Sequence, residues 1–297
     1  MTTSNSQTNE ETIVNHLTRP AILMYFAIAS GLAWSQAAPA SASDEKKLDP
    51  NEGFHVKPVV LDGRNSGGAT VGLQYALQKT WAKNFDQIDK AGSTFNPDAR
   101  LASLAAEIKG SGTVTANKER NPNKLLDIAA NGYYLGSTSL ATYGIGGSMK
   151  YESDQGFDDK QYVYGLTALV SKYGGIFPAN DFGLLQIAYG RVNPKEDAGR
   201  KTALGTTALS SFNRFDAELY YRHQLTGALR GIEFQYRYFR ELNAPVSVKA
   251  AGLDQFRLGT IRLNIMDDRF LAFSSGSLPF DRMKDRSITV GWTYKLD

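Results

Sequence analysis

Arg286-Ser-Ile-Thr-Val-Gly-Trp-Thr-Tyr-Lys-Leu296 decides the fold, because its side chains alternate strictly in character. Apolar residues fall at every second position: Ile288, Val290, Trp292, Tyr294 and Leu296. Small or polar residues occupy the positions between them: Ser287, Thr289, Gly291, Thr293 and Lys295. Because successive side chains of a strand point to opposite faces, this period of two predicts a β-strand with one apolar and one polar face.

The same alternation recurs through most of the chain. Working back from the C-terminus, the sequence predicts strands near 286–296, 269–275, 256–265, 229–240, 212–224, 182–193, 160–173, 139–151, 123–135, 103–116, 69–82 and 54–61. Long or charged connections alternate with tight ones, although 174–181 and 83–102 break this rule. Such loops are typical of an all-β, antiparallel up-and-down transmembrane β-barrel. We predict about twelve strands, with ten as the alternative because Pro58 weakens the first strand.

The N-terminal region reads as an export signal. An apolar block between Pro20 and Trp34 follows Arg19 and gives way to small residues that end at Ala42. The block is too short for a membrane-spanning helix, which needs about 20 apolar residues. We therefore expect residues 1–42 to form a cleaved signal peptide, 43–53 a periplasmic N-terminal tail and 54–297 the barrel.

The hairpin around 225–228 illustrates the register we expect on the inner face. With a two-residue loop, Asp216 lies opposite Arg237. A register in which Glu218 faces Glu233 would place like charges directly opposite each other, which is destabilising. On the outer face, Tyr and Trp are expected in two belts at the membrane interfaces. The residues assigned to these belts are Tyr151, Tyr162, Tyr164, Tyr189, Tyr236, Tyr238, Phe256, Trp81, Tyr133, Tyr173, Tyr221, Trp292 and Tyr294.

The final strand also resembles a known assembly signal. Thr289, Gly291, Tyr294 and Leu296 have the spacing of the C-terminal β-signal of bacterial outer-membrane β-barrels, although the chain ends on Asp297 where these proteins commonly end on an aromatic residue. The resemblance is to this porin-like superfamily as a whole. It implies a place in the outer membrane of a Gram-negative envelope. The partners that it implies are outer-membrane lipid, lipopolysaccharide and the outer-membrane assembly machinery.

Composition excludes several kinds of function. The chain has no cysteine, which rules out disulfides, thiolate chemistry and a lipid-modified N-terminal cysteine. Loss of residues 1–42 would change the formal charge from 33 − 30 = +3 to 32 − 28 = +4, and so small an excess argues against a nucleic-acid partner. The mean hydropathy of −0.34 is compatible with a barrel, since lipid-facing and lumen-facing residues alternate.

Catalysis and metal binding have little support in the sequence. After residue 42 the chain has two histidines, His55 and His223, and neither lies in a motif typical of barrel hydrolases. Two isolated histidines without cysteine do not make a metal ligand set. The acidic run at 152–159 is interpreted as a solvated surface loop, with a divalent-cation site as the alternative. We therefore expect no enzyme activity, no catalytic residue, no metal and no cofactor.

A set of charged and amide side chains falls on the inward face of the predicted strands. Its members are Gln74, Gln78, Glu107, Asp127, Lys150, Gln186, Arg214, Asp216, Glu218, Arg222, Glu233, Arg237, Arg262 and Lys295. They are predicted to line the lumen, either as the wall of a narrow channel for passive diffusion of small hydrophilic solutes or as an interior closed by mutual ion pairs. The second interpretation gives a non-conducting structural or partner-binding barrel. A barrel hydrolase is a weaker alternative.

Overall fold

The computed structural model of the chain describes residues 53–65, 67–84, 101–137, 141–173, 181–266, 268–281 and 283–296. The predicted signal peptide and nearly all of the predicted tail lie outside these residues, so both stay predictions. Within the described ranges, no helix is long and apolar enough to cross a membrane.

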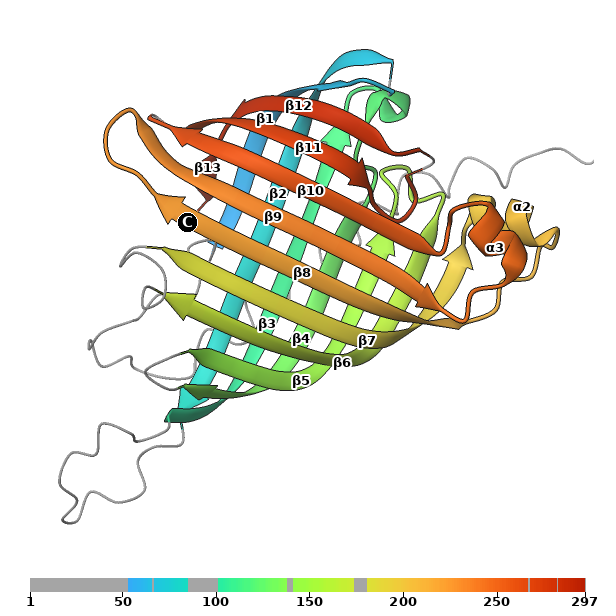
Figure 1. Cartoon of the computed structure of the whole chain (residues 1–297), viewed down its shortest axis with the longest axis horizontal. Coiled ribbons are helices and arrows are strands. Elements are labelled where there is room, and N and C mark those ends of the chain that lie inside the picture. Colours follow the sequence, from blue (N-terminus) through green and yellow to red (C-terminus); the bar gives the residue numbers. More distant parts are fainter. Residues whose placement is uncertain are drawn as a thin grey trace, which may run out of the picture. The chain divides into compact units, whose positions relative to one another are not determined.

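Antiparallel strands make up nearly all of the described chain (Figure 1). They are β1 (Gly53–Gly63), β2 (Gly68–Asn84), β3 (Leu101–Thr115), β4 (Leu126–Ser137), β5 (Thr142–Ser153), β6 (Lys160–Tyr173), β7 (Phe182–Glu196), β8 (Phe212–Gln224), β9 (Leu229–Leu242), β10 (Gln255–Ile265), β11 (Arg269–Ser277), β12 (Asp285–Trp292) and β13 (Tyr294–Leu296). In the described connections between strands lie three short helices: the 3₁₀ helix η1 (Lys118–Arg120), α2 (Ala198–Leu204) and α3 (Val246–Ala250).

The strands close into a barrel of twelve crossings, which confirms the predicted fold class and excludes ten strands. Each strand pairs with its sequence neighbours, and β1 closes the barrel by pairing with both β12 and β13. These two segments form one crossing, interrupted at Thr293. The register places Pro58 opposite Trp292, and proline has no N–H to donate to the ladder. The N–H of Thr293 donates instead to the carbonyl of Asp268 at 2.8 Å.

The two faces of the barrel differ as the alternation predicts. Outward side chains are apolar and exposed, with exposed fractions of 60% at Val71, 62% at Ile145 and 66% at Leu166. A soluble protein does not expose such a continuous apolar band, whereas a closed barrel in lipid requires one.

Most of the predicted belt residues face outward, but three assignments are wrong. Tyr133 and Phe256 have inward parity, where Tyr133 is buried and Phe256 packs on a buried apolar cluster. The strand register places Tyr173 opposite the buried Phe182, which is also an inward position.

The predicted register of the β8–β9 hairpin is also wrong by two residues. Glu218 lies opposite Arg237, and Arg222 lies opposite Glu233. The connection is longer than a two-residue loop, because β8 ends at Gln224 and β9 begins at Leu229. This register sets opposite charges against each other at two positions of the inner face, which is more favourable than the single Asp216–Arg237 pair expected.

The two ends of the barrel carry different connections. One end, the helix end, bears α2 and α3, and the described chain begins and finishes at the other end (Figure 1). Arg200 of α2 is buried and donates to both carboxylate oxygens of Glu241 at 2.5 and 2.8 Å, which fixes the helix to β9. Because outer-membrane barrels have longer loops outside and shorter turns in the periplasm, we assign the helix end to the outside.

Candidate lumen of the barrel

The inward polar side chains surround one cavity of about 360 Å³. Of the fourteen side chains predicted to line the lumen, eleven contact this cavity: Gln74, Gln78, Glu107, Asp127, Lys150, Gln186, Asp216, Glu218, Glu233, Arg237 and Arg262. Arg214 and Arg222 lie on inward positions of β8 but do not border the cavity. The backbone of Lys295 pairs with His55, and its side chain lies outside the described part.

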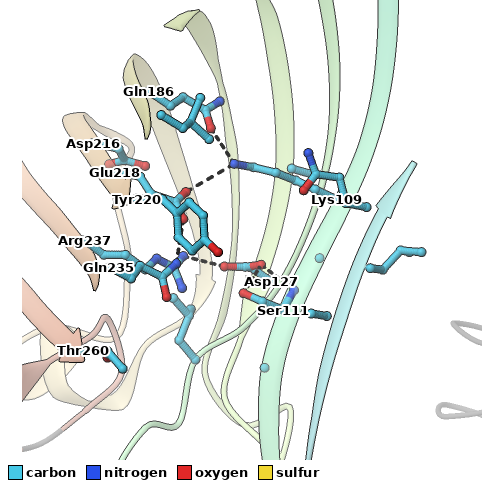
Figure 2. A pocket seen from close by; sticks show the side chains of 18 of the residues that line it. Lys109, Ser111, Asp127, Gln186, Asp216, Glu218, Tyr220, Gln235, Arg237 and Thr260 are labelled. Atoms are coloured by element: carbon cyan, nitrogen blue, oxygen red, sulfur yellow. Dashed lines mark hydrogen bonds and ion pairs between the residues drawn. The ribbon is translucent and has the colours of Figure 1, made fainter. Parts of the chain in front are cut away.

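Two ion pairs reach across the lumen from well-separated strands (Figure 2). Lys109 of β3 donates to Gln186 of β7 at 2.5 Å and lies 3.3 Å from a carboxylate oxygen of Glu218 on β8. Arg237 of β9 donates to Asp127 of β4 at 2.6 Å. We call the Lys109–Glu218 and Asp127–Arg237 pairs the cross-lumen bridges. They divide the interior and so limit the size of what can occupy it.

Hydrogen bonds hold both bridges in place. Gln235 donates to Glu218 at 2.7 Å, and the Ser111 backbone N–H donates to Asp127 at 2.9 Å (Figure 2). Glu107 accepts from Gln78 at 2.9 Å and from Asn131 at 2.8 Å. Buried polar groups paired in this way resist rearrangement, because each rearrangement would leave a partner unpaired.

A second charged cluster lies nearer the helix end. Arg214 donates to both oxygens of Glu152 at 2.7 and 2.8 Å and to Asp216 at 2.6 Å. Lys150 lies 3.3 Å from Glu152 and 3.2 Å from Asp216. Glu152 is fully buried, so the interpretation of its position as part of a solvated loop is wrong. The strand continues to Ser153 because the pairing of Glu152 with Arg214 keeps this carboxylate inside.

Several functional side chains escaped the sequence analysis. Lys109 and Gln235 line the cavity beside residues that were identified, and Lys57 lies on the inward face of β1. The alternation of side chains along a strand could have assigned all three to the inner face. Lys109, for example, is two residues after Glu107, and Gln235 is two residues before Arg237. The partners could not be found in this way, because each bridge joins strands that are not neighbours in the sheet.

The connection between β11 and β12 folds into the mouth at the helix end. Leu278 is buried in an apolar cluster with Leu125, Phe239 and Leu258. Three residues further on, the Asp281 carboxylate accepts from the backbone N–H of Lys124 at 2.8 Å and of Leu278 at 2.6 Å. These contacts pin the segment 278–281 over the cavity.

We expect the docking of this segment to weaken as pH rises. Burial raises the pKa of Asp281 from its ordinary value to about 7, despite the two backbone N–H donors. The pKa of Asp281 is higher in the folded protein than in the unfolded chain, so the protonated carboxyl group stabilises the docked segment. This stabilisation is complete below the unfolded pKa, about 4, and is lost as pH rises through 7. Because the chain has no cysteine, a single spin label at Met283→Cys reports the segment. Its mobility should increase between pH 5 and 8, and the Asp281→Asn background should abolish this change. Equal pH responses in both backgrounds would contradict the assignment.

The outer surface carries one histidine–carboxylate pair that sequence analysis missed. Nδ1 of His223 lies 2.8 Å from Asp181, and the hydroxyl of Tyr221 donates to the same carboxylate. Both aromatic side chains belong to β8, and Asp181 directly precedes β7. These contacts tie the start of β7 to β8. The other histidine of the described residues, His55, lies on an inward position of β1.

An apolar outer wall around a polar interior, closed by antiparallel strands, defines a β-barrel that spans a membrane. No protein-family model and no curated protein sequence match the chain. Solved structures of similar architecture include the NanC porin, with 11% identity over 82% of this chain and all of that one at a TM-score of 0.46. They also include the translocator domain of the autotransporter NalP from Neisseria meningitidis, with 13% identity over 94% and 95% and a TM-score of 0.28. Pseudomonas aeruginosa OccK11 gives 8% identity over 82% and 96%, with a TM-score of 0.27.

Proposed function

We propose that this barrel is a narrow channel for the passive diffusion of small hydrophilic solutes across the outer membrane. The observation that carries the proposal is the 360 Å³ cavity, which the cross-lumen bridges cross without filling. A polar space of this size can hold several waters or one small solute. Charged groups on its wall select among solutes by size and charge.

The cross-lumen bridges set the width of the proposed path. The opposite charges of Lys109 and Glu218 cancel, so this ion pair gives the constriction no net charge. The Asp127–Arg237 pair is balanced in the same way. The proposed channel is therefore narrow and only weakly selective at these bridges. Solutes pass beside the bridges, through the part of the cavity lined by β1–β3 and β9–β12.

A non-conducting structural barrel is the second candidate. The apolar cluster around Leu278 at the mouth and the fully paired Arg214 cluster are the observations that favour it. In this alternative the segment 278–281 stays docked, and the buried ion pairs serve to fix the barrel shape.

Single-channel recordings on two bridge variants test the channel. Lys109→Ala should shift selectivity toward cations, because it removes one positive charge from beside Glu218 and leaves the constriction with one less cation. The double variant Lys109→Ala/Glu218→Ala removes the bridge and both charges, so it should raise unitary conductance and return selectivity toward that of the wild type. Leu166→Ala, on the lipid face, is the matched control and should change neither quantity. Bridge variants that are folded and conduct like the wild type would show that solutes do not pass this bridge.

A further inference from the structure

A basic groove lies on the outer wall of the barrel, separate from the lumen. Its volume is about 620 Å³. Four cationic side chains border it, together with one tyrosine and small residues: Arg64, Arg257, Lys284, Arg286, Tyr236, Gly259 and Ser275. We call this surface the basic groove.

Strand register shows that the groove runs across four neighbouring strands. Tyr236 of β9 lies opposite Gly259 of β10, Gly259 lies opposite Ser275 of β11, and Ser275 lies opposite Arg286 of β12. All four positions lie on the outer face of the sheet, because paired positions share a face. Ser287, which follows Arg286, is buried on the inner face, and so is Leu258, which precedes Gly259. The two small residues form the floor, and the larger side chains form the rim.

The groove lies at the helix end, which we assign to the outside. Arg257 is two residues after the start of β10, Arg286 is the second residue of β12, and Arg64 directly follows β1. This is the level at which a lipid-embedded strand leaves the hydrocarbon and meets the head groups of the outer leaflet.

Two described carboxylates lie near the four cations. Asp285 borders the groove but is buried, and its carboxylate accepts from the backbone N–H groups of Asn65 at 2.9 Å and Arg286 at 2.7 Å. Asp62 is exposed on the outer face of β1, two residues before Arg64. Within the part of the chain that the structure describes, none of the four cationic side chains forms an ion pair with a carboxylate. Cations at a membrane surface are stabilised by anionic lipid groups.

Backbone contacts hold the cations together. The N–H of Arg64 donates to the carbonyl of Arg286 at 2.9 Å, and the side-chain amide of Asn65 donates to the carbonyl of Lys284 at 2.8 Å. Gly276 has a φ of 137°, and a Cβ there would lie 1.9 Å from the carbonyl oxygen of Arg257. Only glycine allows β11 to approach β10 this closely beside Arg257.

We propose that the basic groove is a binding site for a phosphorylated glycolipid of the outer leaflet, lipopolysaccharide. Arg257 and Arg286 donate to its phosphate, since guanidinium groups match phosphate oxygens in geometry and charge. Arg64 and Lys284 add positive charge at the rim. The sugar to which the phosphate is attached lies over Gly259 and Ser275, where the wall has no bulky side chain. The site rests on the membrane location of the barrel and is independent of whether the lumen conducts.

Native mass spectrometry of the folded barrel, titrated in detergent with purified lipopolysaccharide, tests the site. Two variants remove it in different ways. Arg257→Gln/Arg286→Gln deletes the charges, and Gly259→Leu fills the floor, where a Cβ meets only the Tyr236 ring at 3.8 Å. Arg191→Gln/Arg240→Gln is the matched control, because both arginines are exposed, outward and near the same end but outside the groove. Heat-modifiable gel migration verifies that each variant is folded.

The wild type and the control pair should retain one lipopolysaccharide, and both groove variants should bind it at least about tenfold more weakly. Dephosphorylated lipopolysaccharide should bind the wild type as weakly as intact lipid binds the variants, and millimolar inorganic phosphate should not displace the intact lipid. Equal binding by folded groove variants and wild type would overturn the proposal. Equal binding of the dephosphorylated lipid would also overturn it, and displacement by free phosphate would reduce the site to a simple anion site.

Discussion

Replacing Val290 with arginine is expected to cost about 2–4 kcal/mol of folding free energy, the range for a cationic side chain facing the bilayer midplane. Val290 has an exposed fraction of 47% and lies between two other outward apolar residues, Val60 and Leu271. An arginine here would have to leave the hydrocarbon or draw water into it. Urea-dependent unfolding in lipid vesicles, followed by heat-modifiable gel migration, measures the loss.

Thr80→Arg is the control for this substitution. Thr80 faces the lumen, borders the cavity and lies opposite Glu107, which gives an introduced arginine both space and a counter-charge. It should change the free energy of unfolding by about 1 kcal/mol or less. Similar losses for the lumen and the lipid position would contradict the two-face assignment.

Arg214→Met is expected to destabilise the barrel by about 3–5 kcal/mol, the cost of leaving a buried charge without its partner. Glu152 has no exposed surface and depends on Arg214 for two hydrogen bonds, so Lys150 and Gln161 would be its remaining described partners. The same vesicle unfolding assay measures the effect.

Adding Glu152→Gln to Arg214→Met should recover a large part of the lost stability, because the stranded charge is then absent. This double-mutant design separates the ion pair from the loss of side-chain packing. A loss below about 1 kcal/mol in the single variant, or no recovery in the double variant, would show that Glu152 is not held by Arg214.

The alternation of side chains was sufficient to predict the barrel, because a strand in lipid must separate its two faces along its whole length. Strands such as 212–224 and 160–173 coincide with β8 and β6. Strand ends were harder, since Glu152 and Ser153 are polar and still belong to β5. Pro58 made the first strand look weaker than it is. The N–H that proline lacks falls beside the interruption at Thr293, so β1 tolerates Pro58.

Placement of the lumen side chains followed from parity, but their partners did not. The Asp216–Arg237 pair was wrong because the loop length was misjudged, and a shift of two residues keeps the face while changing every neighbour. Thr289 shows a further limit. It has lumen parity and borders the cavity, but it is almost fully buried between Leu61 and Ala272, because this part of the wall is packed with apolar side chains. The role of Thr289, Gly291, Tyr294 and Leu296 in assembly stays a prediction.

Ionic conductance of the wild-type barrel in planar lipid bilayers is the most direct test of the central claim. The protein should insert as single units that conduct small ions in discrete steps, with only weak charge selectivity when a salt gradient is applied across the membrane. Folded, inserted protein that passes no current at pH 5 or at pH 8 would contradict the channel and favour the non-conducting structural barrel.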